Sequence, residues 1–170
     1  FYYRFHYLHV GLGTFYLLEG TMRVLQIPLS HWAGHACDRG QTRRALALGI
    51  IALAASMLFW ILATPLAWWW LWGAYLLWAA WAAINVAGPT LTLQHAPRGD
   101  NTLHLAIAER GAGMCAGIAG LLGGSLLSFF VSPSDFVRWP YLLLFTLGLI
   151  GRLASLYWLA RIDQPTERSK

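Results

Sequence analysis

Residues 45–64 read ALALGIIALAASMLFWILAT and contain no charged side chain. At about 1.5 Å per residue, a helix of this length covers about 30 Å, which is the thickness of the hydrocarbon core of a bilayer. Lipid offers no hydrogen-bond partner to the backbone, so a chain that crosses it as a single segment must be helical. The stretch therefore predicts a membrane-spanning helix.

The rest of the chain repeats this pattern. Of its 170 residues 58% are hydrophobic and 11% are charged, whereas a soluble domain carries about a quarter charged residues. Further spanning helices are predicted at 14–36, 68–93, 102–130 and 139–160, with the end of an earlier helix at 1–9 and a hydrophilic tail at 161–170. We therefore predict an all-α fold: one polytopic transmembrane bundle of about five full spanning helices plus the end of a sixth.

The basic residues lie mostly in short segments between these helices. When successive segments are assigned to alternating sides, one side holds Arg39, Arg43, Arg44, Arg98, Arg161, Arg168 and Lys170. The other side holds Arg4 and Arg138. Cytoplasmic loops carry the excess of Lys and Arg, so the distribution predicts a protein of the cytoplasmic (inner) membrane with a cytoplasmic C-terminus. Membrane topology rather than nucleic-acid binding then explains the net charge of +5.

One polar loop carries a recognisable motif. Residues 34–44 read GHACDRGQTRR, which resembles the loop signature G-x-x-x-D-R-x-G-R-R of the major facilitator superfamily. The residues that match in register are Gly34, Asp38, Arg39 and Arg43. Gln41 and Thr42 take the places of the expected glycine and first arginine, and Gly40 lies one residue earlier. The order of helices that follows is similar to helices eight to twelve of that family.

This resemblance implies a secondary transporter that works by alternating access, with this chain forming most of its C-terminal six-helix half. Its implied partners are a small-molecule substrate, with a proton as the candidate coupling ion, and the missing N-terminal half of the same polypeptide. Export of drugs or small metabolites is the expected direction. The chain starts without Met in a hydrophobic context, so we expect a fragment that does not transport alone. The resemblance also implies that the helices at 45–64 and 139–160 are peripheral.

The loop motif has two interpretations. Asp38 could pair with arginines beside the positive N-terminus of a neighbouring helix, and breaking that contact would bias one conformation of the bundle. Alternatively, Arg39 and Arg43 only fix the topology. The resemblance favours a gating role.

Several ionisable residues lie inside the predicted spans, where they are costly and usually face a bundle interior. Glu19 and Arg23 are four residues apart on one helix face, so they form either a substrate or proton site or a neutralising pair. Glu109 and Arg110 are adjacent and point to different faces. A role in the cavity or the cytoplasmic gate and structural pairing with other helices both stay open. For Arg152 we expect either an interhelical ion pair or a long side chain that reaches the membrane interface.

Two further patterns fall on helix faces. Trp78, Trp81 and Asn85 follow i, i+3, i+7 spacing near Tyr75. The family resemblance implies that this helix lines the central cavity, whereas ordinary helix packing explains an aromatic stripe equally well. The Gly113–Gly117 and Gly120–Gly124 pairs let a neighbouring helix approach closely.

No catalytic constellation is present, so no enzyme, cofactor or metal is predicted. His31 and His35 lie four apart near Cys37 and Asp38, but they lack a convincing ligand set. The alternative to a transporter is a non-transporting integral membrane protein, either an assembly or regulatory subunit or an intramembrane enzyme.

Overall fold

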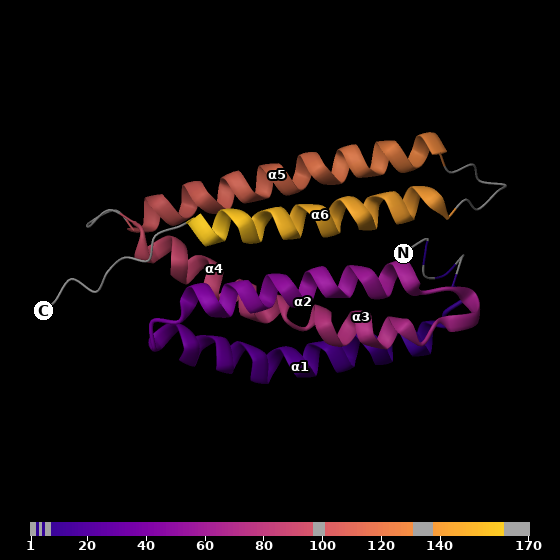
Figure 1. Cartoon of the computed structure of the whole chain (residues 1–170), viewed down its shortest axis with the longest axis horizontal. Helices are drawn as coiled ribbons and strands as arrows, with labels where there is room; N and C mark the ends of the chain where they lie inside the picture. Colours follow the sequence, from indigo (N-terminus) through magenta and orange to yellow (C-terminus); the bar gives the residue numbers. More distant parts are fainter. Residues whose placement is uncertain (1–2, 4, 6–7, 97–100, 131–137, 162–170) are drawn as a thin grey trace, which may run out of the picture.

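The computed structural model describes residues 3, 5, 8–96, 101–130 and 138–161. They form α1 (Leu12–Asp38), α2 (Thr42–Leu62), the short 3-10 helix η2 (Pro65–Ala67), α3 (Trp70–Trp78), α4 (Trp81–Gln94), α5 (Asn101–Phe130) and α6 (Trp139–Arg161). These residues contain no strand, which confirms the predicted all-α fold. The long helices run side by side, so the α1–α2 loop lies at one end and the turn at Pro65 at the other (Figure 1).

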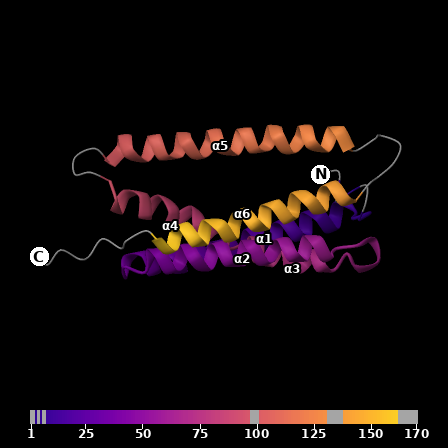
Figure 2. The same cartoon turned by 45° about the horizontal axis from the view of Figure 1, so that its top comes forward.

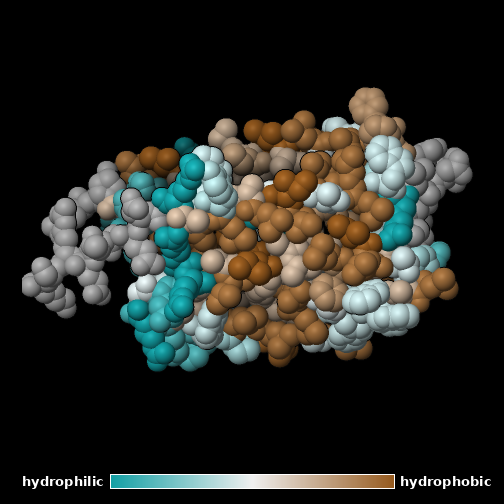
Figure 3. All heavy atoms as spheres, in the orientation of Figure 1, coloured by the Kyte–Doolittle hydropathy of each residue, from teal (hydrophilic) through white to brown (hydrophobic). Residues whose placement is uncertain are grey.

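The described helices suit a membrane. The segments Thr42–Leu62, Trp70–Gln94, Asn101–Phe130 and Trp139–Arg161 are long and apolar enough to cross one. α1 is one helix of 27 residues, but the charged pair Glu19 and Arg23 interrupts its apolar sequence. Hydrophobic residues form a broad belt over the visible face, and hydrophilic residues gather toward its ends (Figure 3). The chain is therefore a membrane protein.

Helix α2 is the centre of the bundle. It packs against α1, α3, α4 and α6, and eight of its residues are buried, including Leu53, Ser56 and Trp60. Its charged residues are confined to its first turn, so the rest of the helix can be covered on every side without burying a charge. Within the described residues α2 therefore contacts four other helices, whereas the family resemblance implied a peripheral position for residues 45–64.

Arginine side chains join α2 to α6 at both ends of the pair. Near the start of α2, Arg43 donates to the carbonyl of Ala160 at 2.6 Å. Just before α6, Arg138 donates to the carbonyls of Ile61 and Ala63 at 2.7 and 3.2 Å. The last carbonyls of a helix have no hydrogen-bond partner within it and carry a partial negative charge. Each arginine therefore donates to terminal carbonyls of the other helix and offsets their negative charge. We call these contacts the arginine clasp.

The predicted helix over 68–93 is interrupted. It begins at Trp70, and a turn at Ala79 and Ala80 divides it into α3 and α4. The turn is held by i→i+3 bonds, from the N–H of Ala82 to Ala79 and from that of Ala83 to Ala80. The prediction of one continuous helix was wrong, because an Ala-rich stretch carries no Pro or Gly to mark a break.

Helix α5 is the outermost element. It contacts α4 and α6, yet none of its residues is buried. It stands away from the other helices when the molecule is turned (Figure 2). A Cβ added at Gly113, Gly117, Gly120 or Gly124 would meet nothing within 4 Å in the described part of the chain. The close neighbour that the sequence predicted for this face is therefore absent from the described residues.

Candidate functional site

A cavity of about 160 Å³ lies between α1, α2 and α3. Its lining residues are Glu19, Met22, Arg23, Trp60, Tyr75 and Trp78. Glu19 lies about 10 Å along α1 from its first residue, at 1.5 Å per residue. Trp60 lies near the end of α2. The cavity therefore lies between α1 and two segments that are long and apolar enough to cross a membrane, nearer the Pro65 end of the bundle.

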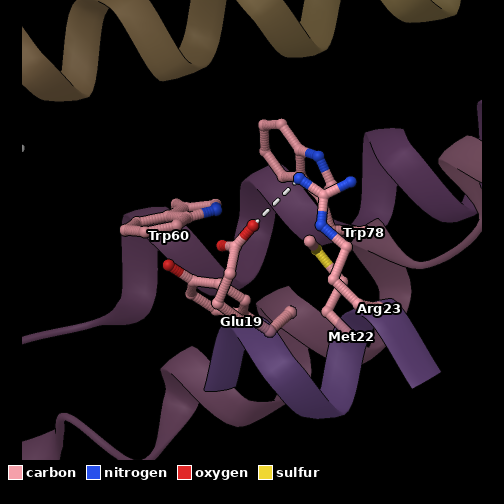
Figure 4. A pocket seen from close by; sticks show the side chains of 6 residues that line it. Glu19, Met22, Arg23, Trp60 and Trp78 are labelled. Atoms are coloured by element: carbon pink, nitrogen blue, oxygen red, sulfur yellow. Dashed lines mark hydrogen bonds and ion pairs between the residues drawn. The ribbon is translucent and has the colours of Figure 1, made fainter. Parts of the chain in front are cut away.

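An ion pair crosses the opening of this cavity. Arg23 Nη2 donates to Glu19 Oε1 at 3.1 Å, and Arg23 Nη1 donates to Gln26 Oε1 at 3.4 Å. The Glu19 side chain is 31% exposed and that of Arg23 is 65% exposed, so the carboxylate is the more enclosed partner. Glu19 and Arg23 reach toward each other, with Trp60 and Trp78 on either side (Figure 4). The ion pair, one of the two interpretations that the i, i+4 spacing left open, therefore exists, and it faces a cavity.

Buried aromatic rings form the wall beneath the ion pair. Trp60 and Tyr75 are each 6% exposed, and their ring centroids are 6.0 Å apart. Trp60 also stacks on Phe145 of α6, with centroids 5.7 Å apart and planes inclined by 29°. These contacts fix the orientation of the Trp60 ring. The cavity therefore combines a carboxylate, a guanidinium and an aromatic wall.

Only part of the predicted aromatic stripe reaches this cavity. Trp78 lines it, whereas Trp81 and Asn85 are exposed residues of α4. The turn at residues 79–80 changes the helix face, so the i, i+3, i+7 spacing no longer places the three side chains together. Trp60 was missed, because a tryptophan within an uninterrupted apolar helix carries no signal that separates lining from packing.

The remaining intramembrane charges lie elsewhere. Glu109 and Arg110 are exposed on α5 and form no ion pair within the described residues. Arg152 is half-buried on α6 and donates to its own helix, at the carbonyl of Gly148, at 3.1 Å. The interhelical pair expected for Arg152 does not form with any described carboxylate.

The signature loop lies at the end of α1 that joins α2 (Figure 1), whereas the cavity residues Glu19, Met22 and Arg23 lie in the first half of α1. Gly40 has φ +72°, and its N–H donates to the carbonyl of Cys37 at 3.0 Å. The N–H of Gln41 donates to Ala36 at 2.8 Å. These two bonds form a Schellman motif, which requires a left-handed residue just beyond the helix. Gly40 lies one residue earlier than the glycine of the family pattern because the left-handed position just beyond α1 falls there.

Gly40→Ala is expected to lower the free energy of unfolding by about 1–2 kcal/mol, because a Cβ is strained at positive φ. Gly40→Asn should cost less, since asparagine tolerates this conformation. Denaturant titration in detergent micelles, followed by far-UV circular dichroism, measures both. Equal stability of Gly40→Ala and the parent would contradict the strained backbone.

Thr42 and Arg43 make contacts that the sequence did not predict. Thr42 is 2% exposed and its hydroxyl accepts a hydrogen bond from Gln94 Nε2 at 3.0 Å, which joins α2 to the end of α4. Arg43 forms one half of the arginine clasp.

Asp38 and Arg39 are exposed and form no ion pair in the described part of the chain. Gly34 has open space around it there. The predicted Asp38–arginine contact is therefore not formed.

The candidate metal ligands near this loop do not assemble. His31 and His35 bring their Nε2 atoms within 3.1 Å of each other, and both rings are exposed. Across the described residues no group of three or more His, Cys, Asp and Glu side chains could hold a metal ion. The contact is a histidine pair without further ligands.

No protein-family model, curated protein or solved structure matches this chain. The resemblance to the major facilitator superfamily therefore rests on residues 34–44 and on the order of the helices. It supports a proposal about function, and the cavity at Glu19 supplies the chemistry.

Proposed function

We propose that this chain takes part in secondary transport of a small molecule, with the cavity at Glu19 and Arg23 on the substrate path. One observation carries the proposal: an ion pair inside a membrane-spanning bundle faces a cavity with aromatic walls. Ionisable side chains at this depth are costly and mark substrate or ion pathways. Aromatic rings add a surface that binds the apolar or cationic part of a small molecule.

Alternating access requires a second set of helices that rocks against this one. The exposed Glu109 and Arg110 of α5 support such a partner, because charged side chains within a membrane face protein or water rather than lipid. The glycines of α5 leave room for close approach of another helix. We propose that the partner is the N-terminal half of the same polypeptide, as the family resemblance implies.

The orientation follows from the charges at the two ends. Arg39, Arg43 and Arg44 lie at the end of the α1–α2 loop, which we assign to the cytoplasm of a cell with an inner membrane. The cavity then lies nearer the outer side. The bonds from Arg43 to Ala160 and from Gln94 to Thr42 hold the cytoplasmic ends of α2, α4 and α6 together. We propose that these contacts, rather than an Asp38 ion pair, are released when the cytoplasmic side opens.

The test is flux through the natural polypeptide that carries these residues, reconstituted into liposomes with an imposed pH gradient. Four probes are used. Glycine betaine represents zwitterionic cargo, choline and lysine represent cationic cargo, and ethidium represents aromatic cargo. We expect saturable uptake of at least one probe and a loss of about tenfold or more in Glu19→Gln, since a charge-assisted contact to the carboxylate is removed. Ser128→Ala, which removes a hydroxyl that donates to the Ser125 carbonyl of the same helix, is the control.

Two results would overturn the proposal. One is the absence of saturable flux for every probe from liposomes that contain correctly folded polypeptide. The other is flux that Glu19→Gln leaves unchanged, because the cavity would then lie off the path. The 170-residue chain alone should show no flux, and saturable flux by it would refute the need for a partner half.

A further inference from the structure

We infer that the cavity at Glu19 and Arg23 selects a small zwitterion, a molecule that carries an ammonium and a carboxylate group close together. The inference deepens the proposed function and rests on it for the placement of this cavity on a transport path. Its observations are the balanced charges at the opening, their unequal exposure and the aromatic wall beneath them.

Charge balance is the first argument. The site contains one anion and one cation 3.1 Å apart, so it is neutral before a ligand arrives. A simple cation that displaced Arg23 from Glu19 would leave the guanidinium without its partner inside the membrane, and a simple anion would do the same to the carboxylate. Unpaired charge at this depth is strongly unfavourable. A zwitterion supplies a partner to both groups and keeps the site neutral.

The unequal exposure sets the orientation of the ligand. Glu19 is the more enclosed partner and lies over the wall formed by Trp60, Tyr75 and Trp78. An ammonium group at Glu19 would lie against these rings, which attract cations through their negative faces. Arg23 is 65% exposed at the rim, where its planar fork can bind a carboxylate. The ammonium therefore enters first, and the carboxylate stays at the opening.

The size of the cavity matches the ammonium end of such a ligand. At about 160 Å³ it is close to the roughly 150 Å³ that holds one benzene molecule. A trimethylammonium or a small ammonium-bearing group fills this space while the carboxylate remains at Arg23. The expected class therefore includes betaines and small amino acids.

The binding test uses the 170-residue chain in lipid nanodiscs and isothermal titration calorimetry. The probes are glycine betaine, choline and 3,3-dimethylbutanoate, which share a trimethyl head. Glycine betaine carries both charges, choline carries only the positive charge, and 3,3-dimethylbutanoate carries only the negative charge. We expect glycine betaine to bind about tenfold or more tightly than either single-charge analogue, since each of these leaves one protein charge unpaired. Equal or tighter binding of choline would overturn the inference, as would no heat of binding for glycine betaine.

Variants locate the binding within the cavity. Glu19→Gln with Arg23→Gln removes both charges and should weaken glycine betaine by about tenfold or more. The charge swap Glu19→Arg with Arg23→Glu keeps an i, i+4 pair that supports the fold, but it takes the carboxylate away from the aromatic wall, so it should weaken binding as well. Trp78→Leu should weaken binding more than Trp78→Phe, which retains a ring. If the swap and the double glutamine variants both bind like the parent, the cavity is not the site.

The two proposals fail in different ways. Glycine betaine binding in nanodiscs without flux in liposomes would refute transport and leave the zwitterion site standing. Saturable flux of ethidium or choline without binding of glycine betaine would support transport and refute the zwitterion site.

Discussion

Replacing Arg43 and Arg138 together by alanine is expected to lower the free energy of unfolding by about 3–6 kcal/mol, at about 1.5–3 kcal/mol for each charged hydrogen-bond donor removed. Each arginine satisfies carbonyls at the end of the neighbouring helix, and Arg138 reaches two of them, at Ile61 and Ala63. Loss of both leaves the ends of α2 and α6 without these partners. Unfolding in mixed detergent micelles, followed by tryptophan fluorescence, measures the change.

Matched variants separate the clasp from a general effect of charge. Arg39→Ala removes an exposed arginine just before the start of α2, where Arg43 lies. It should change the free energy of unfolding by no more than about 0.5 kcal/mol. Arg138→Lys keeps the charge but loses the planar fork, so it should fall between the parent and Arg138→Ala. If Arg43→Ala and Arg138→Ala were each as stable as Arg39→Ala, the clasp would not hold the two helices together.

Gly73→Ala is expected to lower the free energy of unfolding by about 1–3 kcal/mol through overpacking between α2 and α3. A Cβ at position 73 would lie 2.3 Å from Cε1 of Phe59, which is closer than packed atoms tolerate. The Phe59 ring is also in contact with Trp70, at a centroid distance of 5.5 Å, so it is hindered from moving aside. The same micelle titration reports the effect.

Gly20→Ala is the control for this substitution. Gly20 is exposed on α1, and a Cβ there would meet nothing within 4 Å in the described chain. Alanine favours a helix by about 1 kcal/mol over glycine, so Gly20→Ala should be neutral or stabilising. Adding Phe59→Leu to Gly73→Ala should recover part of the loss. A stable Gly73→Ala variant would show that the contact of Gly73 with Phe59 is loose.

Local patterns in the sequence were enough for most of the helices, but not for the turn that divides α3 from α4. The uncharged residues 45–64 lie within α2 except for their last two, and Pro65 marks the short turn that follows. The i, i+4 spacing placed Glu19 and Arg23 on one helix face and left an ion pair and a substrate or proton site as alternatives, and the structure forms the pair. Gly40 was noted only as a departure from a motif, although its place after α1 has a purely local cause in the Schellman motif.

The arrangement of those helices depended on tertiary packing. Nothing local distinguishes Trp60, which lines the cavity, from other tryptophans in the chain, and nothing in Ala79 and Ala80 marks the turn that takes Trp81 away from it. The contacts of Arg43 with Ala160 and of Thr42 with Gln94 join residues 117 and 52 positions apart. Hydrophobicity and helix periodicity act over a few residues, so by itself the sequence determined most of the helices and the shared helix face of Glu19 and Arg23. The central place of α2, the arginine clasp and the aromatic wall of the cavity were decided by packing between distant segments, which no pattern along the chain records.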